Sequence, residues 1–550
     1  MEAFLTANLA PIMFAVLVLF LLSGFPVAFA LAANGLCFGL LGIELGLLKP
    51  ELLQALPNRI FGIMANDTLL AIPFFTFMGL ILERSGMAED LLDTIGQLFG
   101  PIRGGVAYAV IFVGALLAAT TGVVAASVIS MGLISLPVML RYGYDRKLAA
   151  GVIAASGTLA QIIPPSLVLI VMADQLGRSV GDMYRAAFVP GLLLTALYAG
   201  YVLALSIFKP AAVPALPLEA RNLRQPNGDS GVRSLLVLVL GAGAAAWLFA
   251  RYWGARHPAL ASDELGIATA AVGIIGAFVF ALLNRQFKLG LLSRMAEKVV
   301  FVMVPPLALI FLVLGTIIIG LATPTEGGGM GAMGALLLAL FNRRLTLDLT
   351  RQAMHSTTRL SCFVVFILIG STVFSLVFRG VNGDLWVEHL LSALPGGTTG
   401  FLIVVNLLFF ALAFFLDFFE LAFILVPLVG PVADKLGIDL IWFGVLLGVN
   451  MQTSFMHPPF GFALFYLRSV APKEVKTSDI YWGAIPFVLI QILMVVLIIG
   501  FPQLVTVGKK VDMKEQLELR LDDPAPAAAS EEHPDGEAPT LNFSTDEEKK

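Results

Sequence analysis

A series of helix-breaking residues occurs twice in this chain of 550 residues, and the second series follows the first at a constant distance of 294 residues. Pro164 and Pro165 recur as Pro458 and Pro459. The same distance separates five earlier pairs, which are Gly86 and Gly380, Pro101 and Pro395, Pro137 and Pro431, Gly143 and Gly437, and Asp145 and Asp439. Such an ungapped match indicates an internal duplication. Breakers at matched depths in an apolar chain are typical of secondary transporters.

The composition places the chain in a membrane. Hydrophobic residues make up 58% of it and charged residues 13%, whereas soluble domains are about half apolar and a quarter charged. Apolar stretches long enough to cross a bilayer recur along most of the sequence. We therefore predict an all-α polytopic membrane protein, with candidate spans at 10–23, 26–46, 66–82, 148–176, 186–208, 232–250, 265–283, 299–322, 324–341, 353–378, 440–468 and 480–503.

Two further apolar segments are too short and too interrupted to cross the membrane twice. They lie at 105–140 and 400–433, and we predict that each is a re-entrant hairpin that enters and leaves on one face. The spans that follow them, 148–176 and 440–468, contain the paired prolines. Because proline interrupts a helix, these two spans are expected to be discontinuous helices.

The distribution of Lys and Arg over the loops predicts the orientation of the chain. Outside the C-terminal tail, 20 basic residues fall on one side of the predicted spans and 8 on the other. Assigning the richer side to the cytoplasm makes both termini periplasmic. The first hairpin then opens to the cytoplasm and the second to the periplasm, so the two repeats are predicted to be inverted.

The duplication also divides the chain. We predict the first inverted repeat at 1–209 and the second at 299–507. Between them, 210–298 holds a cytoplasmic linker rich in Pro, Asn and Gly and an inserted two-helix hairpin at 232–283, which has no counterpart in the first repeat. The acidic, low-complexity tail at 508–550 cannot bury a core and is expected to be disordered.

Four interruptions combine small or hydroxylated residues with Gly or Pro. They are TTGVVAAS (120–127) and ASGTLAQIIPPS (155–166) in the first repeat, and LDFFELA (416–422) and GVNMQTSFMHPPFG (448–461) in the second. Proline frees a carbonyl one turn before it, which hydrocarbon does not tolerate unless protein or water covers it. Unwound carbonyls and side-chain oxygens suit a hard monovalent cation, and half-helix N-termini attract anions. One pair of breaks in each repeat thus predicts two cation sites, and the alternative is that each proline only bends a membrane helix.

Several ionisable residues at membrane depth allow two interpretations each. Asp417 is a cation ligand or proton carrier, or else an ion-pair member or the cap of a returning half-helix, and Glu420 lies one turn further in. Glu326 in ATPTEGGG is favoured as a helix cap, and His457 as a hydrogen-bonded structural histidine. No Ser/His/Asp set, HExxH, Walker loop or CxxC pattern occurs. The sequence therefore predicts no catalytic residue, no enzyme and no cofactor.

Together these motifs are recognisable. GVVAAS, GYD, AASGTLAQIIPPS, ATPTEGGG, FLDFFELAFILVPLVGPVADKLGIDLIWFGV and NMQTSFMHPPFGFALFYL resemble the large membrane subunit of tripartite ATP-independent periplasmic (TRAP) transporters, the DctM-like family, over nearly all of 10–505. The resemblance implies an inverted-repeat, sodium-driven elevator in the bacterial inner membrane. It also implies two partners, a small four-helix membrane subunit and a periplasmic binding protein that delivers an organic acid.

The resemblance further implies sodium-binding residues in both halves, and no metal other than sodium. Carried onto this chain they are Thr120, Thr121, Ser127, Ser156, Gly157 and Thr158 in the first half and Asp417, Asn450, Thr453 and Ser454 in the second. The implied substrate region comprises Pro164, Pro165, Ser166, Glu420, Pro458 and Pro459, with Arg359 as a candidate partner of the substrate carboxylate. Many members have Gly-Ser-Ser at the first tip where this chain has GVVAAS. Backbone carbonyls are therefore expected to supply more of that site.

The predicted function is sodium-coupled uptake of an organic acid by a TRAP permease subunit. The segment HPPFGFALFYL is similar to members that handle 2-oxo acids and similar carboxylates. The alternative is a stand-alone sodium- or proton-coupled carboxylate symporter or antiporter that needs no binding protein.

Overall fold

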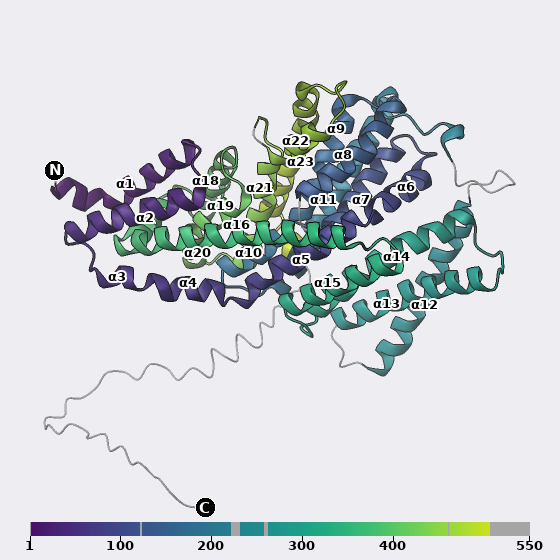
Figure 1. Ribbon diagram of the computed structural model, residues 1–550, viewed down its shortest axis with the longest axis horizontal. Coiled ribbons are helices and arrows are strands. Elements are labelled where there is room, and N and C mark those ends of the chain that lie inside the picture. The colour runs from purple at the N-terminus through teal and green to yellow at the C-terminus, as the bar shows by residue number, and fades with distance from the viewer. Residues whose placement is uncertain (1, 122–123, 222–230, 258–261, 460, 507–550) are drawn as a thin grey trace, which may run out of the picture. The chain divides into compact units, whose positions relative to one another are not determined.

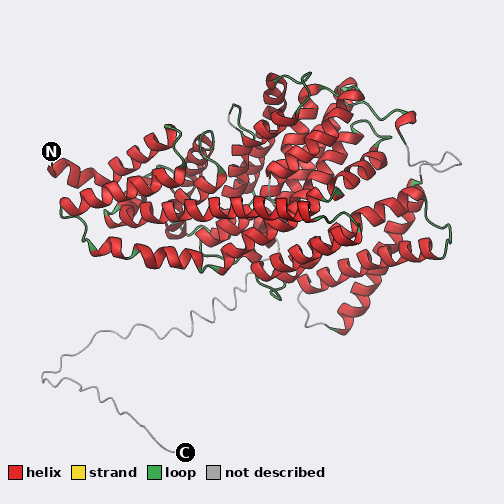
Figure 2. Cartoon of the chain, viewed as in Figure 1, coloured by secondary structure: helices red, strands yellow, loops and turns green. Residues whose placement is uncertain are grey.

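The computed structural model describes residues 2–121, 124–221, 231–257, 262–459 and 461–506, and its regular secondary structure is helical throughout these ranges (Figures 1 and 2). The predicted all-α class is confirmed. The first part of the chain forms α1 (Glu2–Leu22), α2 (Val27–Glu44), α3 (Glu51–Gln54), α4 (Leu56–Met64), α5 (Asp67–Arg84), α6 (Met87–Phe99), α7 (Gly105–Thr121), α8 (Val124–Arg141), α9 (Arg146–Thr158), the short 3₁₀ helix η1 (Leu159–Gln161), α10 (Leu167–Gln175) and α11 (Val180–Phe208).

The linker and the insertion follow, and then the second part of the chain. The linker contains η2 (Pro210–Ala212) and η3 (Leu218–Ala220), and the insertion contains α12 (Val232–Arg256) and α13 (Ser262–Gln286). The second part forms α14 (Arg294–Ile318), α15 (Pro324–Phe341), α16 (Leu347–Gly380), α17 (Gly383–Ser392), α18 (Gly397–Leu412), α19 (Phe418–Ile424), α20 (Val426–Lys435), α21 (Leu440–Met451), η4 (Gln452–Phe455), α22 (Phe462–Val470), α23 (Thr477–Gly500) and α24 (Gln503–Thr506). The tail at 508–550, predicted to be disordered, lies outside the described residues.

The duplication is visible element by element. A shift of 294 residues brings α6 onto α17, α7 onto α18, α9 onto α21, α10 onto α22 and α11 onto α23, and it brings α8 onto the pair α19 and α20. The prolyl bonds Pro164–Pro165 and Pro458–Pro459 are both cis. The two halves therefore share one succession of helices and breaks, and α12 and α13 have no counterpart in the first half.

The repeated Gly-x-Asp motif has a local structural cause. Gly143 and Gly437 end α8 and α20 with φ values of +82° and +72°, a left-handed conformation that glycine adopts without steric cost. Two residues later, the Asp145 carboxylate accepts a hydrogen bond from Leu148 N at 3.0 Å and caps α9. Asp439 caps α21 in the same way. Each motif thus ends a hairpin and starts the helix that will be interrupted.

Small residues bring the long helices close together. On α15, a Cβ added to Gly328 or Gly331 would lie 2.9 Å from Phe74 or 2.5 Å from Met78 of α5, respectively. On α16, a Cβ at Gly370 would lie 2.4 Å from the carbonyl oxygen of Ala28 of α2. Membrane helices associate through such close packing, because lipid supplies no hydrophobic driving force. The glycines of ATPTEGGG therefore have a packing role. Its glutamate forms the predicted cap, a reciprocal capping box with Thr323.

The number of membrane spans differs from the prediction of twelve. Of the described helices, seven are long and apolar enough to cross a membrane, or up to nine if each bent pair counts as one span. The predicted spans omit 47–65, where α3 and α4 form, and α4 meets α5 at a bend of 46°. The interrupted segments at 148–176 and 440–468 are not among these helices, because each consists of separate helices that are individually too short to cross a membrane. In α12 and α13, only 6% of each apolar window is buried, so both helices leave most of their surface open.

Candidate functional site

The first interruption lies between α9 and α10. The chain leaves α9 at Thr158, makes the turn η1, passes the paired prolines and re-enters a helix at Ser166. The Ser166 hydroxyl donates to the Gln161 carbonyl at 2.5 Å and caps α10 by accepting from Leu169 N. This half-helix therefore begins inside the protein, with all of Leu167–Ala173 buried.

The second interruption repeats this arrangement between α21 and α22. Thr453 of η4 donates to the Asn450 carbonyl at the end of α21, at 2.6 Å. The Asn450 amide donates to both the carbonyl and the side-chain oxygen of Asn406, at 2.8 and 2.9 Å. Because Asn406 belongs to α18, these bonds fix the second break to that helix.

One hydrogen bond joins the two interruptions. The Gln452 side-chain amide donates to the Thr158 carbonyl at 2.9 Å and to its hydroxyl at 3.2 Å. These two residues are 294 positions apart, so each is the repeat counterpart of the other. The Gln491 amide on α23 extends the network to the Tyr198 hydroxyl on α11 at 2.9 Å. Because all four side chains are buried, the network ties the halves together at equivalent points.

The tip of the second hairpin is organised by Asp417 and Glu420. The Asp417 carboxylate accepts from Glu420 N, and the Glu420 carboxylate accepts from Asp417 N, each at 2.9 Å. This is a reciprocal capping box at the start of α19. The capping interpretation of Asp417 is therefore confirmed. Capping uses part of each carboxylate, and the remaining oxygen lone pairs leave room for a further ligand.

A cavity of about 390 Å³ is lined by residues from both predicted hairpin tips and from both interruptions. Its lining comes from α8 (Val124, Ala125), the first break (Gln161, Leu167), α16 (Leu360, Phe363), the second tip (Asp417, Phe418, Phe419, Glu420) and the second break with α22 (Phe455, Phe462, Tyr466). Three pairs of these residues are repeat counterparts, which are Val124 and Phe418, Ala125 and Phe419, and Gln161 and Phe455. The cavity is thus built in part from equivalent positions of both halves.

The sequence pointed to only part of this lining. Asp417 and Glu420 were predicted, whereas Gln161 and Tyr466 were not. Gln161 is 4% exposed, and its side-chain oxygen has no hydrogen-bond partner among the described residues. It lies within the quoted AQIIPPS break, so its nearness to the prolines was the available signal.

The first predicted sodium group is partly described. The helical backbone of α7 includes Thr120 and Thr121, whose side chains lie outside the described residues. Ser127 is buried on α8 next to Val128, and a Cβ at Gly157 of α9 would meet Val128 at 2.3 Å. The structure thus brings this part of α8 against the end of α9. There the Ser156 hydroxyl is buried without a hydrogen-bond partner in the described chain.

The residues of the second predicted sodium group lie in two different places. Asn450 at the end of α21 and Thr453 and Ser454 in η4 are close in sequence and all buried. The Ser454 hydroxyl has no hydrogen-bond partner among the described residues. Asp417 lines the cavity instead, whereas these three side chains do not. Buried oxygens without partners are the groups that a hard cation would coordinate.

The remaining predicted residues are placed as follows. The paired prolines of both breaks form the connections into α10 and α22. Arg359 is exposed on α16 and does not line the cavity, although its neighbour Leu360 does. His457 is buried against Phe410 and Phe414, with ring centroids 4.3 and 4.2 Å away. The Ala413 backbone interacts with its ring, although neither ring nitrogen makes a hydrogen bond of normal geometry to a described residue, and the hydrogen-bonded histidine stays a prediction.

Comparison with known proteins identifies the family. A family model described as the tripartite ATP-independent periplasmic transporter, DctM component, matches residues 14–504. The chain belongs to this family. It is therefore a multi-pass membrane protein and the large permease type of TRAP subunit, as the motifs predicted. Its relatives are transporter permeases rather than enzymes.

Relatives of this DctM-family chain differ in substrate. The C4-dicarboxylate TRAP transporter large permease protein DctM of Pseudomonas aeruginosa is 28% identical over 458 residues, covering 83% of this chain and 89% of that protein. The 2,3-diketo-L-gulonate TRAP transporter large permease protein YiaN of Escherichia coli is 24% identical, covering 88% and 96%. The isethionate TRAP transporter permease protein DctMQ of Oleidesulfovibrio alaskensis is 23% identical, covering 85% of this chain and 61% of that protein.

A solved structure is also similar to this DctM-family chain. The crystal structure of the YdaH transporter of Alcanivorax borkumensis covers 84% of this chain and 91% of its own, with 16% sequence identity and a TM-score of 0.48.

Proposed function

We propose that this permease subunit takes up a small organic acid by sodium-coupled secondary transport, and that the cavity at the hairpin tips is the site where acid and cation meet. The three relatives named above are described as transporters of a dicarboxylate, a sugar acid and a sulfonate, which are all organic anions. This shared chemistry supports an organic anion here, with a dicarboxylate or 2-oxo acid as the first candidates.

The charge of the cavity lining carries the proposal. The lining contains two carboxylates, Asp417 and Glu420, and no Lys, Arg or His among the described residues. Two like unit charges 4 Å apart cost about 4 kcal/mol at the effective dielectric constant of 20 that suits partly buried pairs. An organic anion would therefore bind more tightly together with cations that neutralise the tip, which supports cation coupling at this site.

The cation would be held by oxygen ligands from both halves. The candidates are those of the two predicted groups, with the buried Ser156 and Ser454 hydroxyls as oxygens that still need a partner. The N-termini of α10 and α22 begin at the two breaks and would attract the carboxylate of the substrate. Sodium is the coupling ion that the family resemblance implies.

We further propose that α7 with α8, and α18 with α19 and α20, are re-entrant hairpins of two inverted repeats. The repeats span 1–209 and 299–507, and 210–298 forms the linker and insertion. The element-by-element correspondence and the Thr158–Gln452 bond support a duplication about a common centre. Transport would then be an elevator movement of the hairpins and broken helices, in the inner membrane and with both termini periplasmic.

The partners are part of the proposal. A small four-helix membrane subunit and a periplasmic binding protein would complete the system, with the binding protein delivering the acid. The alternative is a stand-alone symporter or antiporter coupled to sodium or protons. The two differ in whether the purified chain transports without partners.

Uptake by proteoliposomes tests the proposal. The complete permease is reconstituted and given labelled succinate or 2-oxoglutarate, with its binding protein, under an inward gradient of sodium or of potassium at equal pH. Uptake that requires both the binding protein and the sodium gradient is expected. Equal uptake in potassium would refute sodium coupling, and uptake without the binding protein would establish the stand-alone alternative.

A further inference from the structure

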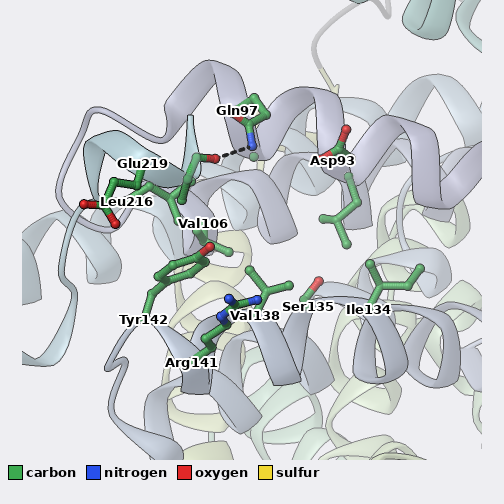
Figure 3. Close-up of a pocket in the computed structure, with 13 residues that line it drawn as sticks. Asp93, Gln97, Val106, Ile134, Ser135, Val138, Arg141, Tyr142, Leu216 and Glu219 are labelled. Carbon is green, nitrogen blue, oxygen red and sulfur yellow. Dashed lines mark hydrogen bonds between the residues drawn. The ribbon is translucent and has the colours of Figure 1, made fainter. Parts of the chain in front are cut away.

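A second cavity, of about 410 Å³, lies between α6, the end of α8 and the linker (Figure 3). Its walls are partly apolar, with Leu92, Val106 and Val138 among them. The linker closes one side and is fixed in place, because the Gln97 side-chain amide donates to the Ala220 carbonyl at 3.0 Å. The basic loops assign this end of the molecule to the cytoplasmic side.

The basic group and the hydroxyl at this cavity point into it, and the acidic groups point away. In Figure 3 the Arg141 guanidinium and the Ser135 hydroxyl point into the space from α8, whereas the carboxylates of Asp93 and Glu219 point away from it. Asp93 is also neutralised by Lys298 at 2.7 Å. Ser135 is 2% exposed, and its oxygen has no hydrogen-bond partner among the described residues. The space therefore offers a cation and an unused hydroxyl.

The second repeat shows what Arg141 lacks. Its counterpart Lys435, the last residue of α20, is paired with Glu388 of α17 at 2.5 Å. The counterpart of Glu388 is Thr94 of α6, whose hydroxyl donates instead to the Asp90 carbonyl in its own helix. Arg141 has no carboxylate partner in the described part of the chain. Its guanidinium lies 5.9 Å from the centroid of the neighbouring Tyr142 ring and is exposed at the edge of the cavity.

We propose that this cavity binds an anionic group, a phosphate or a carboxylate with a small apolar body, between the Arg141 guanidinium and the Ser135 hydroxyl. The bound anion gives Arg141 the counter-charge that its counterpart Lys435 receives from Glu388. Its source is either the headgroup of an anionic lipid or a soluble organic anion on the same side of the membrane. The site lies apart from the hairpin tips and requires no sodium.

Thermal unfolding of the complete permease in sodium-free buffer tests this proposal. In nanodiscs of phosphatidylcholine, the protein is titrated with inorganic phosphate or succinate, and a second sample contains phosphatidylglycerol without added anion. Saturable stabilisation by a soluble anion identifies that source, and stabilisation by phosphatidylglycerol identifies the lipid. No stabilisation in either arm overturns the proposal. Because sodium is absent, the result is independent of the transport site.

Three variants connect the response to the cavity. Arg141→Gln is expected to weaken the anion response about ten- to hundredfold, since a charge-assisted hydrogen bond contributes roughly 1.5–3 kcal/mol. Ser135→Ala is expected to weaken it about three- to tenfold. Arg103→Gln removes an exposed charge outside the cavity lining and serves as the matched control. An unchanged response in Arg141→Gln, or an equal loss in Arg103→Gln, would contradict the assignment.

Discussion

The capping box at the second hairpin tip allows its structural and functional roles to be separated by one substitution. Asparagine caps helices about as well as aspartate, because both offer a side-chain oxygen to the N–H groups of the first turn. Asp417→Asn therefore keeps an acceptor for Glu420 N, which now lies 2.9 Å from the carboxylate, and removes only the charge. Asp417→Ala removes both the charge and the acceptor.

The expected magnitudes differ enough to be measured. Loss of a carboxylate 4 Å or less from a bound cation costs about 4 kcal/mol of attraction at an effective dielectric constant of 20, or roughly three decades of sodium affinity. Asp417→Asn should therefore move the sodium concentration for half-maximal uptake beyond the measurable range. Its unfolding midpoint should stay near that of the wild type. Asp417→Ala should lose the same coupling and also about 0.5–2 kcal/mol of stability.

Two assays distinguish these outcomes. Sodium-dependent uptake in proteoliposomes measures the coupling to sodium. Thermal unfolding in detergent measures how much the cap contributes to stability. Glu420→Gln is a matched control for the cap, because glutamine at this position of a capping box still accepts from the Asp417 N–H. Wild-type sodium activation in Asp417→Asn would refute the reasoning, and Asp417 would then be a cap alone.

Three further substitutions test the packing around the site. Gln452→Met leaves the Thr158 carbonyl without its partner from the other repeat, and a lower unfolding midpoint is expected, equivalent to about 1–3 kcal/mol. Gly483→Ala places a Cβ 2.0 Å from the Lys147 carbonyl, so α9 and α23 must separate, and reduced yield of folded protein in size-exclusion chromatography is expected. Lys435→Met breaks the pair with Glu388, but both side chains are partly exposed. Thermal unfolding should therefore change by less than about 1 kcal/mol.

Local rules recovered much of the fold. The matched prolines located both interruptions, and the Gly-x-Asp motifs located the end of each hairpin, because φ and capping are decided by one or two residues. The same local reasoning identified the Thr323 and Glu326 capping box. Asp417 and Glu420 have the same spacing, so their box was equally accessible from the sequence.

Features that depend on contacts between distant segments were not predicted. The hydrogen bond between Thr158 and Gln452 forms because the two breaks meet in space. The residue spacing within either segment does not show that the two segments meet. Gln161 borders the cavity for the same reason. The contacts of His457 with Phe410 and Phe414 require the end of α18 and the turn that follows it to approach the second break. Sequence periodicity describes single helices and does not state which helices meet.

The symmetry of the backbone makes the chemistry of the two halves directly comparable. At three equivalent positions of the cavity, Val124 stands opposite Phe418, Ala125 opposite Phe419, and Gln161 opposite Phe455. The first half therefore provides space and an amide, and the second half provides aromatic surface and two carboxylates. If transport exchanged the conformations of two identical halves, its end states would have equal energy. Because these pairs differ in volume and polarity, we infer that the end states differ in energy. A bias of only about 1.4 kcal/mol shifts their ratio tenfold, so the cation binding proposed at the second tip would decide which state predominates.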